Sequence, residues 1–270
     1  MSDIKRIAFL GGGNMAEAII KGLLRENSGV PLMIAEIAPE RRDYLTKAYP
    51  NVRVVENSAE AAAWGEVVFL AIKPQQATSV LTTLERTLSP DKLIVSIMAG
   101  VRTGSIEEAL ENGTRVVRVM PNTPALVGMG ATAICPGRKA TPLDLDRVET
   151  IFAQTGLVVR VEEKQMDAVT GLSGSGPAYV FTFVEALSDA GVKNGLSREI
   201  ASRLAVQTVL GAARMLAETG EHPALLREKV TSPGGTTIAA LHTLENGRFR
   251  GVIMDAVDAA SQKSKELAGK

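Results

Sequence analysis

The sequence predicts a doubly wound α/β domain followed by an all-helical domain, and two observations carry this prediction. Up to about residue 162, short apolar runs alternate with amphipathic segments, whereas beyond that point the pattern is helical throughout. The apolar runs are continuous rather than alternating, which is typical of parallel strands covered by helices on both faces. We therefore predict two domains, residues 1–162 and residues 163–270.

The individual elements follow from the same patterns and from helix start signals. Ser197 is placed to cap one helix of the second domain, and Pro177 and Pro223 suit the first turn of two others. Strands are expected at 4–10, 32–36, 52–55, 67–72, 92–97, 116–120 and 157–161. Helices are expected at 14–27, 40–48, 59–63, 76–88 and 144–154, then at 178–190, 198–218, 223–230, 237–245 and 249–267.

Composition excludes several classes of protein. The chain has 270 residues, of which 45% are hydrophobic and 22% charged, as in soluble globular proteins. Lys plus Arg and Asp plus Glu both number 30, so the net charge is zero and neither a nucleic acid nor a membrane surface is an expected partner. Cys135 is the only cysteine, which excludes an intrachain disulfide and fits a reducing, cytoplasmic setting. No metal site is predicted.

The N-terminus does not have the pattern of a targeting segment. The apolar stretch after Lys5 and Arg6 is interrupted by glycines at 11–13 and by Glu17, which leaves it too short for a signal peptide. No uncharged segment is long and apolar enough to span a bilayer. The chain is therefore expected to be soluble from residue 1.

A glycine turn, Gly11-x-Gly13-x-x-Ala16, follows the first predicted strand and opens the first helix. Gly11 permits the tight turn, Gly13 lets the backbone approach a pyrophosphate, and Ala16 keeps the helix close to the strand. The free amide groups of the first helical turn, which contains Asn14 and Met15, then face the phosphates. This context predicts a Rossmann-type site for a nicotinamide dinucleotide used in a reduction, with a purely structural glycine turn as the alternative.

The second strand and the residues after it leave the identity of the dinucleotide open. Glu36 has the position expected for a carboxylate that binds the adenosine ribose, which favours NADH. Arg41 and Arg42 lie just beyond it. These side chains are placed to meet a 2′-phosphate, which favours NADPH, or to form a solvated helix face.

A second cofactor segment, Ala71-Ile72-Lys73-Pro74, follows the fourth strand, where a Rossmann sheet presents its backbone to the dinucleotide. Pro74 fixes the start of the next helix. Lys73 is placed either to reach a phosphate or the nicotinamide ribose, or to be an exposed lysine at a helix start.

Three further segments are candidates for a substrate site. Residues 120–124 end a strand at the carboxyl edge of the sheet, where ligands of open α/β sheets bind. Residues 173–178 form a helix start of small residues that permits close approach. Residues 232–237 combine glycines with a helix start, which suits a carboxylate, and Thr236 or Thr237 adds a hydroxyl. The structural alternatives are a rigid connection and a capped helix after a glycine turn.

Six segments, in this order and spacing, resemble the pyrroline-5-carboxylate reductase family, and the resemblance runs from residue 4 to about residue 265. It implies NAD(P)H-dependent reduction of the C=N bond of 1-pyrroline-5-carboxylate to L-proline, the last step of proline biosynthesis. The segments are Gly-Gly-Gly-Asn-Met-Ala at 11–16, Ala-Ile-Lys-Pro at 71–74, Met-Pro-Asn-Thr-Pro-Ala at 120–125, Leu-Ser-Gly-Ser-Gly-Pro-Ala-Tyr at 172–179, Thr-Gly-Glu-His-Pro at 219–223 and Ser-Pro-Gly-Gly-Thr-Thr at 232–237.

The resemblance also implies roles for matching residues. Backbone amides of the loop 232–237 would hold the substrate carboxylate, and the Thr237 hydroxyl, the implied catalytic group, would bond the ring nitrogen. Asn57 would lie near the adenosine ribose or its phosphate. The remaining implied positions are Ser232, Gly234, Gly235 and Thr236 in the carboxylate loop, Gly176, Pro177 and Ala178 in the pocket wall, and Pro121 and Asn122 near the nicotinamide.

Assembly and cofactor preference are implied in the same way. The family builds its site across a dimer of interlocked helical domains, and decamers built from dimers occur. It commonly prefers NADPH. Glu36 departs from the small or basic residues often seen at its position, so NADH stays an alternative.

Two other functions are alternatives for a chain with this organisation. A β-hydroxyacid dehydrogenase needs a lysine base near the start of its helical domain, but Val180 occupies that position and no lysine occurs between Lys164 and Lys193. An NADP-sensing protein without chemistry would have degenerate substrate segments, whereas 173–178 and 232–237 are intact. His222 and His242 are the only histidines, and His222 is expected to be structural. We therefore expect the substrate to bind as its iminium or to be protonated through water.

Overall fold

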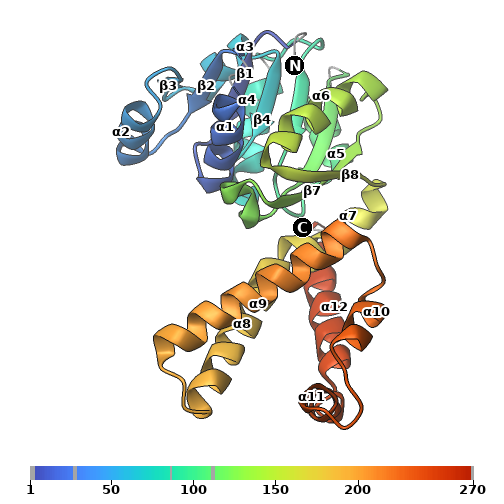
Figure 1. Cartoon of the computed structure of the whole chain (residues 1–270). Helices are drawn as coiled ribbons and strands as arrows, with labels where there is room; N and C mark the ends of the chain where they lie inside the picture. Colours follow the sequence, from blue (N-terminus) through green and yellow to red (C-terminus); the bar gives the residue numbers. More distant parts are fainter. Residues whose placement is uncertain (1–3, 27–28, 86, 111–112, 269–270) are drawn as a thin grey trace. The chain divides into compact units, whose positions relative to one another are not determined.

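The computed structural model describes residues 4–26, 29–85, 87–110 and 113–268 (Figure 1). These residues form two compact units. One consists of the described residues of Met1–Ser175 and Ala259–Lys270, and the other is Gly176–Asp258. The predicted domain boundary after residue 162 stays a prediction. Residues 27 and 86, which fall within two predicted helices, lie outside the described part of the chain.

The first unit contains an eight-stranded sheet in the order β3-β2-β1-β4-β5-β6-β7-β8. The first six of these strands are parallel, and the direction of winding reverses between β1 and β4. In open α/β sheets this switch point is where ligands bind, at the carboxyl ends of the strands. The strands are β1 (Ile7–Leu10), β2 (Leu32–Ala35), β3 (Arg53–Val55), β4 (Val67–Leu70), β5 (Leu93–Ser96), β6 (Arg115–Met120), β7 (Gly130–Pro136) and β8 (Gly156–Arg160).

The sheet is parallel except at one pairing near its edge. Strand β7, which was not predicted, is antiparallel to β6, with Met120 opposite Ala133, and β8 is parallel to β7. Only a short 3-10 helix, η2 (Thr123–Val127), connects β6 to β7. A parallel neighbour would need a long crossover connection, so a short one returns the chain antiparallel.

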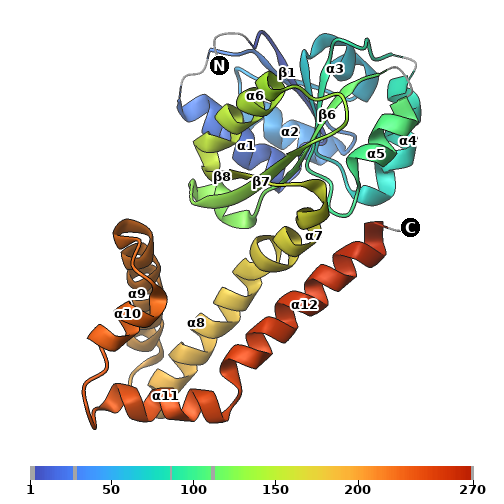
Figure 2. The same cartoon turned by 90° about the vertical axis from the view of Figure 1, so that its right-hand side faces the viewer.

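Helices cover both faces of the sheet, as expected. One face packs against α1 (Asn14–Arg25), α2 (Pro39–Ala48) and α6 (Pro142–Phe152). The other packs against α3 (Ser58–Trp64), α4 (Ala77–Glu85) and the unpredicted α5 (Thr103–Leu110). Figure 2 shows α4 and α5 on one side of the sheet and α1 and α6 on the other. The rings of Phe9 and Phe69 stack, with their centroids 4.6 Å apart, in the core under α1, α2 and α6. The next residues along each strand, Leu10 and Leu70, pack in the core on the opposite face of the sheet.

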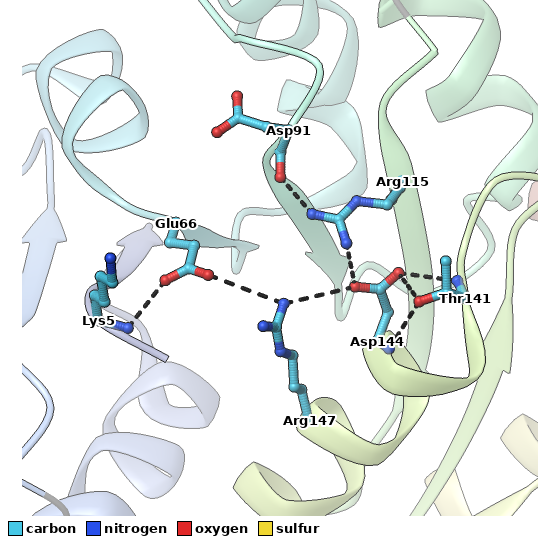
Figure 3. Close-up of polar contacts among 7 residues, drawn as sticks. All are labelled: Lys5, Glu66, Asp91, Arg115, Thr141, Asp144 and Arg147. Carbon is cyan, nitrogen blue, oxygen red and sulfur yellow. Dashed lines mark hydrogen bonds and ion pairs between the residues drawn. The ribbon is translucent and has the colours of Figure 1, made fainter. Parts of the chain in front are cut away.

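The start of α6 is fixed by a buried carboxylate, that of Asp144, which is fully buried. Its Oδ2 accepts hydrogen bonds from the Thr141 amide (2.9 Å) and hydroxyl (2.7 Å), forming a capping box. Its Oδ1 lies 2.6 Å from Arg115 of β6. Arg147 lies 4.0 Å from Asp144 and 3.9 Å from Glu66. Figure 3 shows the whole network, in which the Lys5 amide also donates to Glu66 and Arg115 donates to the Asp91 carbonyl.

The second unit is entirely helical, as predicted. Ser197 caps α9 (Arg198–Thr219) by accepting from the Ile200 amide, and His222 caps α10 (Pro223–Lys229) by accepting from the Ala224 amide. Before this unit come the 3-10 turn η4 (Glu163–Gln165), α7 (Met166–Val169) and one π-helical turn, η5 (Thr170–Gly174). The helices are α8 (Gly176–Lys193), α9 (Arg198–Thr219), α10 (Pro223–Lys229), α11 (Thr236–Asn246) and α12 (Phe249–Ala268), and the last part of α12 belongs to the first unit.

The helical unit leaves most of its apolar side chains exposed. Within residues 176–258, all of which are described, only Ser188, Ala201 and Ala205 are buried. Phe181 of α8 is 67% exposed and Leu204 of α9 is 55% exposed. Apolar surface of this extent marks an interaction surface. Nowhere in the described part of the chain is a helix both long and apolar enough to span a bilayer.

Candidate active site

The glycine turn lies at the carboxyl end of β1, beside the switch point. Gly11 has a φ of +99°, and a Cβ there would lie 2.4 Å from the carbonyl oxygen of Ala71. Its amide donates to the carbonyl of Ala35 at 2.8 Å. Gly11 therefore lets the turn contact the ends of both neighbouring strands, β2 and β4, which no residue with a side chain permits.

The N-terminus of α1 is open. Its N-cap residue, Gly13, has no side chain to accept from the first amide groups, and a Cβ there would meet no described atom within 4 Å. Asn14 is exposed, Met15 is half-buried, and Ala16 packs in the core at 1% exposure. Free amides and the positive end of the helix dipole at an accessible site fit the pyrophosphate of a dinucleotide.

A cavity of about 330 Å³ lies beside this turn. Glu36 lines it from the end of β2, and Lys73 lines it from the segment after β4. Six predicted cofactor residues are brought together here, namely Gly11, Gly13, Glu36, Ala71, Ile72 and Lys73. Six others, Asn14, Met15, Asn57, Pro74, Pro121 and Asn122, lie outside this lining in the described structure.

The Glu36 carboxylate is held by two backbone amides. Its Oε2 accepts from the Gly12 amide at 2.9 Å and its Oε1 accepts from the Ala38 amide at 2.9 Å. A Cβ at Gly12 would lie 2.4 Å from Cδ1 of Leu45. Gly12, which carried no role in the sequence interpretation, is thus the point where the glycine turn, β2 and α2 meet.

Arg41 is occupied within the protein. Its Nε donates to the Gly12 carbonyl at 2.7 Å and its Nη2 lies 2.6 Å from Glu17 Oε2. The Arg41 side chain is 27% exposed, whereas that of Glu17 is 7% exposed. In this structure Arg41 ties α2 to the glycine turn and to α1.

Glu17 is the buried centre of this arrangement, and the sequence interpretation missed it. Burial raises its pKa, but hydrogen bonds from Tyr49, Arg41, Lys21 and Tyr44 outweigh burial and lower the pKa to about 2. The Tyr49 hydroxyl donates at 2.7 Å and the Tyr44 hydroxyl at 2.9 Å. Glu17 therefore keeps its negative charge at neutral pH and holds Arg41 in place.

Arg42 is also occupied. Its Nη1 donates to the carbonyls of Glu36 (2.9 Å) and Ile37 (2.7 Å), and its Nη2 lies 3.1 Å from Glu56. The side chain is 22% exposed. Arg42 thus fixes the backbone between β2 and α2, and it contributes to the position of Glu36 rather than lining the cavity.

Two further predicted cofactor residues begin helices. Lys73 is exposed, and its amide donates to Gln76 Oε1 at 3.3 Å at the start of the 3-10 turn η1 (Pro74–Gln76). Asn57 caps α3, with its Oδ1 accepting from the amides of Ala59 (2.8 Å) and Glu60 (3.4 Å). The remaining Nδ2 donors of Asn57 and the Lys73 ammonium are the parts of these side chains suited to a ligand.

Pro121 and Asn122 are buried at the carboxyl end of β6. The Asn122 Oδ1 accepts from the Ala131 amide at 2.8 Å, and its Nδ2 donates to the Ser173 carbonyl at 3.1 Å. Asn122 therefore links β6 to β7 and to the π-helical turn. One Nδ2 hydrogen remains beyond these two bonds.

The loop before α11 forms a tight turn. The Gly235 amide donates to the Ser232 carbonyl at 3.1 Å, with Pro233 and Gly234 between them and a φ of +66° at Gly234. Proline followed by a residue with positive φ is typical of a type II turn. Gly235 then caps α11 without a side-chain hydrogen bond. The helix thus presents free amides in its first turn to an accessible loop, which suits a carboxylate.

The two hydroxyls at this helix start differ in exposure. Thr236 is exposed and Thr237 is half-buried. Within the described part of the chain, the Thr237 hydroxyl makes no hydrogen bond, so its donor and its acceptors are available. His242, further along α11, lies 3.1 Å from Asn246 through its Nε2.

Gly176, Pro177 and Ala178 form the first turn of α8. In both views the start of α8 and α11 lie at opposite ends of the helical unit (Figures 1 and 2). One chain therefore does not bring these residues together with the loop 232–235 within its helical unit.

The doubly wound sheet, the open glycine turn at its switch point and the helical unit that follows define a two-domain oxidoreductase of the nicotinamide-dependent class. Two family models match the chain, "Pyrroline-5-carboxylate reductase dimerisation" over residues 163–267 and "NADP oxidoreductase coenzyme F420-dependent" over residues 6–100. The resemblance expected from the sequence is confirmed: the chain belongs to the pyrroline-5-carboxylate reductase family.

Individual relatives agree over the full length. A pyrroline-5-carboxylate reductase of Synechocystis is 48% identical and is aligned over 98% of this chain and 99% of its own. A solved pyrroline-5-carboxylate reductase of Coxiella burnetii has a TM-score of 0.92 and 38% identity, with 98% of this chain and 99% of its own covered. A Plasmodium falciparum pyrroline carboxylate reductase with NADP bound has a TM-score of 0.88 and 35% identity, with 99% of each chain covered.

Proposed function

We propose that this protein reduces the C=N bond of 1-pyrroline-5-carboxylate to give L-proline, in the cytoplasm, as the last step of proline biosynthesis. Family membership over the full chain supports the reaction. The structural observation that carries the proposal is a pair of open helix starts, at Gly13 for a pyrophosphate and at Gly235 for a carboxylate. NADPH use is supported by the descriptions of the matched family model and of the Plasmodium structure, and NADH is the alternative cofactor.

The cofactor would lie along the carboxyl ends of β1, β2 and β4. Amides of Gly13, Asn14 and Met15 would hold the pyrophosphate, and Glu36 would face the adenosine ribose. The bound cofactor supplies the hydride. The other residues assigned to it are Asn57 near the same ribose, Ala71, Ile72, Lys73 and Pro74 along the end of β4, and Pro121 and Asn122 near the nicotinamide.

The substrate would bind at the start of α11. The free amides of Thr236 and Thr237, which follow the turn from Ser232 to Gly235, would hold its carboxylate; a positive φ at Gly234 makes this turn possible. The available Thr237 hydroxyl would bond the ring nitrogen and so orient the C=N carbon. Fixing a reactant in this way accounts for much of the rate enhancement in reactions with little acid–base chemistry on the protein.

Both histidines already contact groups of this chain, so neither is assigned the role of protonating the ring nitrogen. The Nδ1 of His222 accepts from the amide that begins α10, and His242 contacts Asn246. The substrate would therefore enter as its iminium or take a proton through water, as expected from the sequence. The hydroxyl of Thr237 is compatible with either form, since it can both donate and accept.

A second copy of the chain would complete the site. The matched dimerisation model covers the helical unit, whose apolar side chains are exposed in one chain, and the two substrate segments lie at its opposite ends. In an interlocked dimer, Gly176, Pro177 and Ala178 of one chain would form the pocket wall opposite the loop 232–237 of the other. Assembly of such dimers into decamers is part of this proposal. Sedimentation at several protein concentrations tests this self-association, and a monomer mass at all concentrations would contradict it.

One assay distinguishes this function from a β-hydroxyacid dehydrogenase and from an NADP sensor. We expect NADPH or NADH absorbance to fall when 1-pyrroline-5-carboxylate is added, with L-proline formed in equal amount. Reduction of NAD(P)⁺ by 3-hydroxy acids without any imine reduction would instead indicate a β-hydroxyacid dehydrogenase. Tight NADP binding with no turnover of either substrate would indicate a sensor.

A further inference from the structure

A second cavity of the first unit, about 660 Å³ in volume, is lined by the start of α5, by η4 and α7, by the loop after β7 and by the end of α12. It shares no described lining residue with the cavity beside the glycine turn. Charged side chains dominate its wall, and none of them has a part in the proposed reduction. The balance of these charges indicates what the cavity binds.

The carboxylate of Glu163 is fully engaged within the protein. Its Oε1 accepts from the Thr103 amide at 2.9 Å, and its Oε2 accepts from the Thr103 hydroxyl. Behind it lies Arg118, whose side chain is 3% exposed and whose Nη1 is 3.1 Å from Glu163 Oε1. The Nη2 of Arg118 is buried and has no hydrogen-bond partner among the described residues. The charge of Glu163 is therefore neutralised from the interior.

The two other carboxylates of the lining also have partners. Asp167 of α7 is buried and accepts from the hydroxyl of Ser264 of α12 at 2.6 Å. Glu108 lies 3.2 Å from Nη2 of Arg138. No carboxylate of the described lining is thus left to attract a cation into the cavity.

The cations of the lining are not balanced in this way. Arg102, just before α5, and Lys265 of α12 are exposed, and neither forms an ion pair or a hydrogen bond within the described part of the chain. Lys164 pairs with Glu162 at the surface, where the two side chains are 78% and 69% exposed. Such an exposed pair is weak. The charge available to a ligand is therefore positive.

Neutral donors at the start of α5 add to this charge. The amides of Gly104 and Ser105 have no acceptor among the described residues, and the Ser105 side chain is exposed. A Cβ at Gly104 would lie 3.5 Å from Nη2 of Arg138, so this guanidinium reaches the same helix start. Free amides and a nearby guanidinium both favour an anion.

We propose that this cavity binds a small dianion, a dicarboxylate or a phosphate, between Arg102 and Lys265. Two unpaired cations on different elements of the chain match two negative charges better than one. The bound anion would connect α5 to α12 next to the hydrogen bond from Ser264 to Asp167, which joins α12 to α7. Since α7 continues into the π-helical turn, the anion would stiffen the support of that turn.

Isothermal titration calorimetry with succinate and with inorganic phosphate tests the proposal. The titrations are made at constant ionic strength with NADPH present, so that the glycine turn is not the site measured. We expect a Kd in the millimolar range or tighter for at least one of the two dianions, and weaker binding of acetate. Binding of succinate alone would identify a dicarboxylate site, and binding of phosphate alone a phosphate site.

Two variants locate the binding. Arg102→Gln and Lys265→Gln should each raise the Kd about tenfold, the scale of one charge-assisted hydrogen bond. Arg102→Lys keeps the positive charge and should lose less affinity than Arg102→Gln. Lys139→Gln is the matched control, because Lys139 is an exposed cation next to Arg138 but outside the cavity lining. This variant should bind the dianion as the wild type does.

Three results would overturn the proposal. They are no binding of either dianion in the millimolar range, a Kd that neither Arg102→Gln nor Lys265→Gln changes, and an equal loss of affinity in Lys139→Gln. Thermal unfolding shows whether each variant is folded, and the two variants change exposed side chains on different elements. Because no imine is present, the result does not depend on the proposed substrate.

Discussion

Glu36 accepts a hydrogen bond from the amide of Gly12 at 2.9 Å, so the end of β2 and the glycine turn after β1 are joined by one carboxylate. The carbonyl of the same Gly12 accepts from Arg41 at 2.7 Å. The peptide groups of the turn are thus fixed from both sides before any ligand binds. Such preorganisation lowers the entropic cost of holding a pyrophosphate.

Replacing Arg41 with methionine tests this role. Arg41→Met should weaken NADH and NADPH binding by a similar factor of a few-fold, since it loosens the turn that both cofactors contact. It should also lower the free energy of unfolding by about 2 kcal/mol, because buried Glu17 loses a partner. Titration calorimetry and urea unfolding measure the two effects.

The matched control is Arg53→Met. Arg53 pairs with Glu60 at the surface, with both side chains largely exposed (60% and 44%), and exposed pairs contribute little. A loss of NADPH affinity alone in Arg41→Met would mean that Arg41 binds the 2′-phosphate and would contradict the assigned role.

The lowered pKa of Glu17 predicts how the free energy of unfolding depends on pH. Its pKa falls from the ordinary 4.5 to about 2 in the folded protein, so the unfolded chain takes up its proton first as the pH falls. Its contribution is therefore complete above about pH 4.5 and is lost as the pH falls toward 2, and it is on the order of 2–3 kcal/mol. Urea unfolding of wild type and Glu17→Gln between pH 6 and 2.5 measures it.

The expected result is that the stability difference between wild type and Glu17→Gln shrinks as the pH falls through that window. Glu85→Gln, at an exposed position on α4, should follow the wild-type curve. A difference that stays constant from pH 6 to 2.5 would contradict the assigned ionisation of Glu17.

Asp144 anchors the start of α6, and its replacement should be costly. Asp144→Ala removes the capping box and leaves Arg115, 24% exposed, without its carboxylate. We expect a loss of about 3 kcal/mol in the free energy of unfolding. Asp146→Ala on the same helix is the control: Asp146 is 60% exposed where it pairs with Arg160, so its loss should cost well under 1 kcal/mol. Equal losses in the two variants would show that the buried network of Figure 3 has no special weight.

The proposed role of the Thr237 hydroxyl predicts that its removal lowers kcat without changing cofactor affinity. Thr237→Ala should lower kcat for imine reduction by tenfold or more, the scale of a lost hydrogen bond to a charged group, with the Kd for the cofactor unchanged. Thr237→Ser, which keeps the hydroxyl, should restore most of the rate. Thr243→Ala, which removes an exposed hydroxyl of α11 that bonds the Ala239 carbonyl, should behave as wild type. Wild-type turnover in Thr237→Ala would refute the role.

Much of the fold could be predicted because strong local patterns specify it. Continuous apolar runs indicated the buried parallel strands, and glycines in a strand–turn–helix context indicated the open start of α1. The sequence does not indicate strand β7 because its short apolar run starts at Gly130, ends at Pro136 and is interrupted by Thr132. The antiparallel direction of β7 depends on the length of the connection from β6 rather than on the residues of that connection. The missed α5 is short, at 8 residues.

The part of the site that could not be predicted depends on tertiary contacts. The sequence places Arg41 and Arg42 beside a cofactor strand, but it does not show that Glu17 and backbone carbonyls occupy them. In the sequence, Glu17 looks like any other polar residue of α1. It becomes a buried carboxylate only because Tyr44 of α2 and Tyr49, just after α2, pack against it and donate hydrogen bonds. Likewise, the sequence order of the two substrate segments does not show that they lie at opposite ends of the helical unit.

Hydride transfer to the imine is the central claim, and isotope labelling tests it most directly. Protein incubated with 1-pyrroline-5-carboxylate and NADPH or NADH that carries deuterium at both positions of nicotinamide C4 should yield L-proline with one deuterium on the ring carbon that was double-bonded to nitrogen, as measured by mass spectrometry and NMR. Proline without the label, or no proline with either cofactor, would contradict the account.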